Sequence, residues 1–167
     1  MSDKTLRELV YGKGAHVDPV ACVEDLSIGL ASRRAPGYPH SVWQIVLHMN
    51  YWMDYDLRTI SGENPPYPQH AIQSWPEHPD QAQDEQWQAA TRRFGDLLSR
   101  LARLAESDSA ELERIIIKAG PANSQRECTV HAALWEIAAH NSYHAGQIAL
   151  LRRQAGAWPP ERGGDTW

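Results

Sequence analysis

Two histidines lie four residues apart in the segment HNSYHAGQIALLRR, residues 140–153, which otherwise has the pattern of an amphipathic helix. Because residues at i and i+4 lie on one face of a helix, with Cβ atoms about 5–6 Å apart, the imidazoles of His140 and His144 can reach a common point. A metal ion about 2.0–2.1 Å from a nitrogen of each ring fits this spacing. The pair therefore predicts part of a metal site, which a ligand from another element must complete.

His48 is the candidate for the third ligand. It lies between Ile45 and Trp52 on the apolar face of a helix that the sequence predicts over residues 41–61. The apolar faces of neighbouring helices meet in a bundle, so the His48 ring is expected to reach the other two. Three neutral imidazoles leave a coordination position open, which is typical of a catalytic metal site. The alternative is that the three histidines are hydrogen-bonded polar groups of a core without metal.

Other polar residues in these segments have weaker claims to a role. Glu136 precedes His140 by four residues and could orient it by accepting its second ring N–H, but a solvated helix charge is the favoured interpretation. Asn141 and Gln147 are interpreted as structural. His16, in the segment GKGAH, is interpreted as fixing a local turn.

Four further histidines are not expected to join the site. His40 is interpreted as part of a helix start, and His70 and His78 are expected to be exposed in a proline-rich loop. His131 precedes His140 by nine residues, which places it about 13 Å away along a helix axis. That distance is too long for the two rings to share one ion.

Helices must position these side chains, and the chain contains four segments with helical apolar spacing, three of which end near proline or glycine. The predicted helices span residues 18–33, 41–61, 80–107 and 129–156, and Ser41 is the expected N-cap of the second. Residues 62–80 form a proline-rich surface loop, and long loops of this kind often border a functional pocket. The apolar run at residues 115–117 fits a strand, a helical tail or a loop equally well.

This pattern predicts an all-α fold, an antiparallel four-helix bundle that forms one domain over residues 1–167. The length of 167 residues suits one domain. A net charge of −5 argues against nucleic-acid binding, and no apolar run is long enough for a membrane span. The first residues do not resemble a secretory signal, and two isolated cysteines, Cys22 and Cys128, are typical of reduced thiols. We therefore expect a cytoplasmic protein that binds neither membranes nor nucleic acid.

Two segments resemble the DinB-like (DinB/YfiT-like) family of metal-dependent bacterial proteins. They are GKGAHVDPVACVEDL…PGYPHSVWQIVLHMNYW, residues 12–52, and AAHNSYHAGQIALLRRQAGAWPP, residues 138–160. The resemblance implies a four-helix bundle of the up-down-down-up type and one bound divalent metal. It also implies a histidine triad with one ligand from the second helix and two from the fourth, which are His48, His140 and His144 here. Members of this family are commonly homodimers.

The resemblance also implies a class of reaction, because characterised members include thiol transferases and isomerases. We therefore expect a metalloenzyme, with zinc, nickel or iron, that acts on a small molecule by hydrolysis or thiol transfer. A low-molecular-weight thiol is a candidate substrate. Imidazole ligands do not select among these metals, and the sequence identifies no catalytic residue besides the ligands. The alternative is a metal-binding stress-response protein without catalytic activity.

Overall fold

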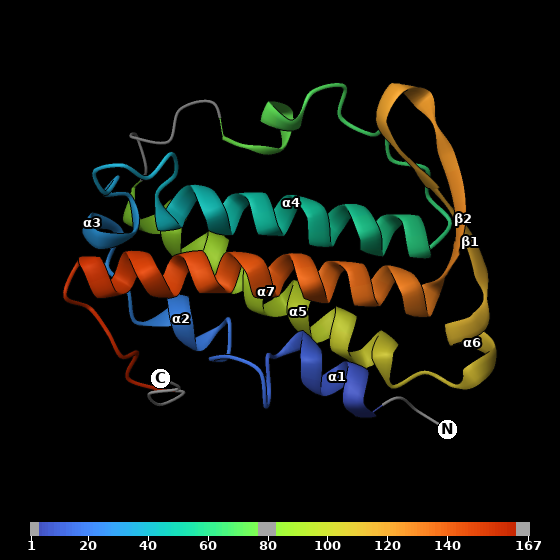
Figure 1. Ribbon diagram of the computed structural model, residues 1–167, viewed down its shortest axis with the longest axis horizontal. Helices are drawn as coiled ribbons and strands as arrows, with labels where there is room; N and C mark the ends of the chain where they lie inside the picture. The colour runs from blue at the N-terminus through green and yellow to red at the C-terminus, as the bar shows by residue number, and fades with distance from the viewer. Residues whose placement is uncertain (1–3, 77–82, 163–167) are drawn as a thin grey trace.

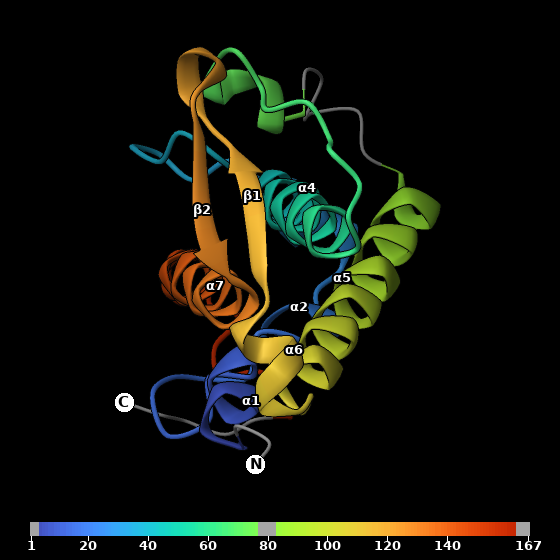
Figure 2. The ribbon, with the colours of Figure 1, turned by 90° about the vertical axis from the view of Figure 1, so that its right-hand side faces the viewer.

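Three long helices, α4 (Val42–Ile60), α5 (Asp84–Ala105) and α7 (Val130–Gln154), form the centre of the protein. The structure is a computed structural model that describes residues 4–76 and 83–162. In Figure 1, α4 and α7 lie side by side and run in opposite directions, and α5 lies behind them. Figure 2 shows α1 at the bottom of the view, below α7 and beside the lower end of α5, and α1 contacts both helices.

Shorter elements connect and flank these helices. They are α1 (Lys4–Val10), α2 (Ala21–Glu24), α3 (Ile28–Ala31), η1 (Ala71–Ser74), α6 (Ser109–Glu113), β1 (Ile115–Ala119), η3 (Pro121–Asn123) and β2 (Gln125–Thr129). The protein is therefore mostly helical, with a small two-stranded sheet that the expected all-α class does not include. None of the helices in the described part of the chain has the length and apolarity that crossing a membrane requires.

The long helices are held together by the apolar face that each one turns inward. Burying a large apolar side chain stabilises a fold by about 1.5–3 kcal/mol, so this core fixes how the helices are rotated. A polar residue on the same face is then buried as well. The fully buried side chains include Met49 and Met53 of α4, Phe94 and Leu98 of α5, and Leu134 and Ile148 of α7.

The helix that carries His48 begins where the sequence predicts. Ser41 is its N-cap: the Ser41 hydroxyl accepts a hydrogen bond from the backbone N–H of Gln44, and the Gln44 side chain accepts one from the Ser41 N–H. This reciprocal pair is a capping box, which satisfies N–H groups that the first turn leaves without partners. The cap sets the start of α4 and hence the position of His48 two turns later.

We expect Ser41→Ala to lower the free energy of unfolding by about 1 kcal/mol, because it removes the hydroxyl acceptor from this buried cap. Urea titration followed by circular dichroism would measure the change. Ser61→Ala, at the exposed C-terminal end of the same helix, is the matched control and should change stability much less. Equal losses in the two variants would contradict the role of the cap.

The predicted helix over residues 18–33 is wrong. The structure has two short helices there, α2 and α3, and the chain between them is not helical. Tertiary contacts explain the break: both carboxylate oxygens of Asp25 accept hydrogen bonds from the buried Arg152 of α7, at 2.5 and 3.0 Å. Ser27 then takes an extended conformation and starts α3. A contact between residues 127 apart thus overrides the local apolar spacing.

The remaining predicted elements agree with the structure to different degrees. The helix over 129–156 corresponds to α7, and that over 80–107 to α5, although residues 80–82 lie outside the described residues. Residues 115–117, which the sequence leaves open, belong to strand β1. This strand pairs antiparallel with β2, and only Ile116 of its three isoleucines is buried. Figure 2 shows the two strands standing beside α4 and α7.

Candidate metal centre

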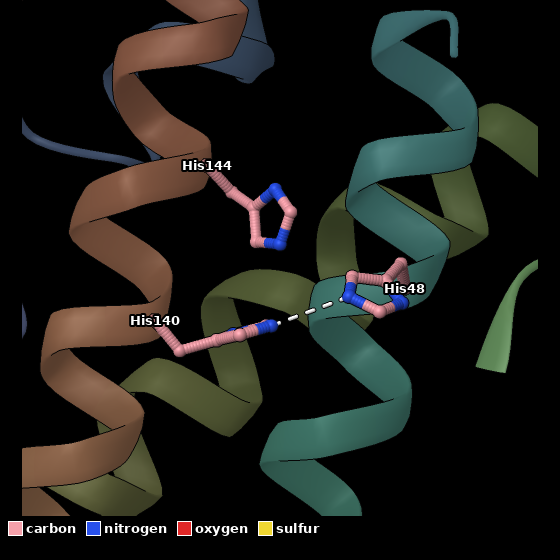
Figure 3. A group of neighbouring side chains, drawn as sticks. All are labelled: His48, His140 and His144. Carbon is pink, nitrogen blue, oxygen red and sulfur yellow. Dashed lines mark hydrogen bonds between the residues drawn. The ribbon is translucent and has the colours of Figure 1, made fainter. Parts of the chain in front are cut away.

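The structure brings His48, His140 and His144 together between α4 and α7. Their ring nitrogens include a set, one from each residue, that all lie within 4.8 Å of one another. Figure 3 shows His140 and His144 reaching from successive turns of α7 toward His48 on the facing helix. This arrangement follows from the fold, because antiparallel helices pack on their apolar faces and all three residues lie on those faces. His48 and His144 are buried, and His140 is partly buried.

The rings are arranged for a shared ligand. The Nε2 atoms of His48 and His140 lie 3.2 Å apart. The His144 ring lies at a centroid distance of 4.9 Å from His48 and 4.5 Å from His140, and it is steeply inclined to both. The rings therefore do not stack on one another, and their nitrogen-bearing edges are free to face a common point.

Hydrogen bonds on the outer side of the rings fix which nitrogen faces inward. The Nδ1 atom of His48 lies 3.2 Å from the carbonyl oxygen and 3.1 Å from the hydroxyl oxygen of Ser74. Because that hydroxyl donates to the Ala71 carbonyl, Nδ1 of His48 must be the donor. His144 Nδ1 likewise donates to the Gln147 side-chain oxygen at 2.7 Å. A neutral imidazole has one N–H, so both Nε2 atoms carry a lone pair.

His140 is held less firmly. Its Nδ1 atom lies 3.4 Å from the Asn141 side-chain oxygen, which is a long contact for a hydrogen bond. In the absence of an ion, a proton on Nε2 of His140 can link it to His48. A cation in place of that proton would let all three Nε2 lone pairs point inward. The donor set therefore fits a divalent metal, since neutral imidazole nitrogen is a common ligand of zinc, nickel and iron.

The environment also keeps the imidazoles neutral, as metal binding requires. Burial, together with the neighbouring His144 and His140 rings, lowers the pKa of His48 to about 3. Burial likewise lowers the pKa of His144 to about 4, and it lowers the pKa of His140. Near neutral pH the three rings are unprotonated.

Two residues of the proline-rich loop contribute to the site, and the sequence analysis did not find them. Ser74 accepts the His48 N–H, and the Trp75 ring stacks on the His48 ring at a centroid distance of 3.9 Å. Trp75 also stacks on His40 at 3.7 Å, so His40 packs against the site instead of serving only the helix start. The proline-rich composition predicted a loop beside a pocket, but nothing in it singles out these two residues.

Glu136 does not orient His140. It is exposed, in agreement with the favoured interpretation as a solvated helix charge. Its carboxylate accepts hydrogen bonds from Lys118 of β1, at 3.1 Å, and from Arg126 of β2. Asn141 and Gln147, interpreted as structural, contact the rings of His140 and His144.

The other weighed residues lie away from the centre. His16 contacts the Val17 carbonyl and the Ser142 hydroxyl, both at 2.8 Å, which agrees with a structural role that also ties the segment to α7. His70 is exposed at the start of η1, and His78 lies outside the described residues. Cys22 and Cys128 are free thiols, and burial raises the pKa of Cys22 to about 12, so it is not a nucleophile near neutral pH.

The chain belongs to the DinB superfamily, which matches it over residues 20–148. This range includes α4 and the part of α7 that carries His140 and His144. The superfamily is metal-associated, in agreement with the three neighbouring histidines. No curated protein and no solved structure matches the sequence.

Proposed function

We propose that the protein is a divalent-metal-dependent enzyme that acts on a small molecule, with His48, His140 and His144 as the ligands of one zinc, nickel or iron ion. The observation that carries this proposal is the outward hydrogen bonding of His48 and His144, which turns an Nε2 lone pair of each ring toward the shared space. Without a metal, a hydrogen bond from His140 can use the Nε2 lone pair of His48, whereas a metal would use a lone pair of all three rings.

The reaction we propose is hydrolysis or thiol transfer. A bound divalent ion would supply Lewis acidity and would lower the pKa of a coordinated water or thiol. The chain's own residues orient and cover the imidazoles. Ser74 and Gln147 hold the rings of His48 and His144 in place by hydrogen bonds, and the Trp75 ring covers one face of His48. Three protein ligands leave room in the coordination sphere for a substrate, which favours an enzyme over a closed structural site.

The domain organisation, the helix topology and the location of the protein are also proposals. We propose one domain over residues 1–167 that is a four-helix bundle of the up-down-down-up type, formed by α1 and the three long helices, and a cytoplasmic location. The opposite directions of α4 and α7 and the long connection between α4 and α5 support this topology. The alternative function is metal binding in a stress response without catalysis.

Elemental analysis of untagged protein tests the metal proposal directly. We expect about one divalent ion per chain, and protein that binds none after incubation with zinc, nickel and iron would refute the proposal. To separate an enzyme from a closed metal site, cobalt-substituted protein is titrated with azide or a thiol. A change in the visible spectrum supports an open coordination position, and an unchanged spectrum supports the alternative.

Gln147 gives a test of the orientation of His144. We expect Gln147→Leu to lower metal affinity by about 10- to 100-fold, because partners of ligand imidazoles contribute about this much. Competition with a fluorescent zinc chelator would measure the affinity. Gln154→Leu, at an exposed position of the same helix, is the matched control and should bind zinc as the wild type does. Equal affinity of Gln147→Leu and the wild type would show that the hydrogen bond does not hold the ring.

We further propose that the protein is a homodimer, and α7 offers a surface for it. Trp135, Tyr143 and Leu150 are 48%, 66% and 45% exposed, and their spacing of eight and seven residues places them on one side of the helix. Light scattering is expected to give twice the mass of the chain, and Leu150→Asp is expected to give a monomer. Ile72→Asp, at another exposed apolar residue, should leave the mass unchanged. A wild-type monomer would refute the dimer.

A further inference from the structure

A cavity of about 240 Å³ lies next to the histidines, bordered by α4, the two strands and α7. His140 lines it, so the cavity and the candidate metal centre share a side chain. An engineered apolar cavity of about 150 Å³ holds benzene, so a space of this size admits one substituted ring. Its other lining residues include Trp52, Tyr55, Tyr67, Lys118, Arg126 and Glu136.

One wall of the cavity is aromatic. The ring of Trp52 lies 5.4 Å from that of Tyr55 and 5.5 Å from that of Tyr67, measured between centroids. Tyr55 and Tyr67 are 6.1 Å apart. Rings at these distances support one another as a packed surface. Trp52 also meets the His48 ring edge-on at 6.4 Å, so the aromatic wall continues to the candidate metal centre. This wall suits the planar, apolar body of a ligand.

Other residues that line the cavity are charged. Lys118 and Arg126 are directly paired across the two strands, although like charges in that position repel. Glu136 accepts hydrogen bonds from both, and the buried Asp56 forms a second ion pair with Lys118 at 2.7 Å. Lys118 thus has two carboxylate partners, while Arg126 shares the single carboxylate of Glu136.

Arg126 is the group that can accept a further anion. Both of its hydrogen bonds to Glu136 come from Nη2, and its side chain is 53% exposed. A guanidinium has five N–H donors in a planar fork, so the ion pair leaves donors for a second acceptor. At His140, which also lines the cavity, a divalent ion held by three neutral imidazoles would keep its full charge. An anionic ligand therefore suits the cavity better than a neutral or cationic one.

We propose that this cavity is the substrate pocket of the candidate metal centre and that it selects a small carboxylate with a planar apolar body. The carboxylate binds Arg126, the planar body packs against Trp52 and Tyr67, and the opposite end of the molecule points toward His140. This inference rests on the proposed function, since the histidines act on the substrate only if they hold a metal.

Benzoate and its neutral analogue benzamide are probes of matched size that test the pocket by calorimetry on zinc-loaded protein. We expect benzoate to bind about tenfold or more tightly than benzamide, because a hydrogen bond to a charged group contributes about 1.5–3 kcal/mol. Arg126→Gln should remove this preference, while Arg92→Gln, at an exposed residue of α5, should keep it. Tyr67→Ala should weaken both probes.

A carboxylate can also bind a metal directly, so the titrations are repeated after the metal is removed by chelation. The proposal expects the difference between wild type and Arg126→Gln to persist there. Equal affinity for the two probes, or wild-type benzoate affinity in Arg126→Gln, would overturn it, and so would a preference that is lost in the metal-free protein. Failure of the proposed function looks different, because elemental analysis then finds no metal while the preference for benzoate remains.

Discussion

Replacing His144 by alanine is expected to abolish stoichiometric metal binding. The ring is buried, its Nδ1 atom donates to Gln147, and its Nε2 atom carries the lone pair that faces the other two histidines. Loss of an orienting partner alone costs about 10- to 100-fold in metal affinity. We expect loss of the ligand itself to cost more than about 100-fold, so that dialysed His144→Ala retains less than a tenth of the wild-type metal.

The matched control is His131→Ala, which removes an imidazole from the same helix, about 13 Å from His140 and about 20 Å from His144 along its axis. It should retain the wild-type metal content. Far-ultraviolet circular dichroism of both variants checks that the helices form. If His144→Ala keeps one ion per chain, or if His131→Ala loses it, the ion is held elsewhere and the assignment of the three ligands fails.

The proximity of the three histidines could be predicted from the sequence because it depends on regular helices. The spacing of His140 and His144 places both residues on the same face of a helix. The apolar residues around His48 indicate which side of its helix faces inward. The structure brings the three rings together as expected. Gln147 also follows this logic, because it lies three residues after His144, but the sequence does not say which of many i, i+3 pairs forms a hydrogen bond.

The surroundings of the triad could not be predicted in the same way. Ser74 reaches His48 across 26 residues of proline-rich chain, and helical periodicity carries no information about such a contact. The break between α2 and α3 depends on Arg152, which is distant in sequence from Asp25. The partners of Glu136 lie on two strands, one of which the apolar run at residues 115–117 left undecided. Tertiary contacts, rather than local preference, decide all three features.

The metal-free protein is expected to lose several kcal/mol of stability between pH 7 and pH 5. In the folded protein the pKa of His48 is lowered to about 3 and that of His144 to about 4, mainly by burial. In the unfolded chain both return to about 6.5. At pH 5 the unfolded state therefore binds protons that the folded state does not, so stability falls as the pH falls below about 6.5. Linkage gives a loss of about 2 kcal/mol for each of these two rings at pH 5.

Urea titrations at pH 7 and pH 5, in the presence of a chelator, would measure this loss. The interval lies above the ordinary pKa of aspartate and glutamate, so histidines dominate the change. His140 and His40, whose pKa values are also lowered by burial, add to it in the same direction.

The double variant His48→Gln/His144→Gln separates the triad from the remaining histidines, because glutamine is polar but does not titrate. Between pH 7 and pH 5, this variant should lose about 4 kcal/mol less stability than the wild type loses. An equal pH dependence in wild type and double variant would mean that folding does not change the pKa of these two rings. That result would contradict their burial as neutral imidazoles.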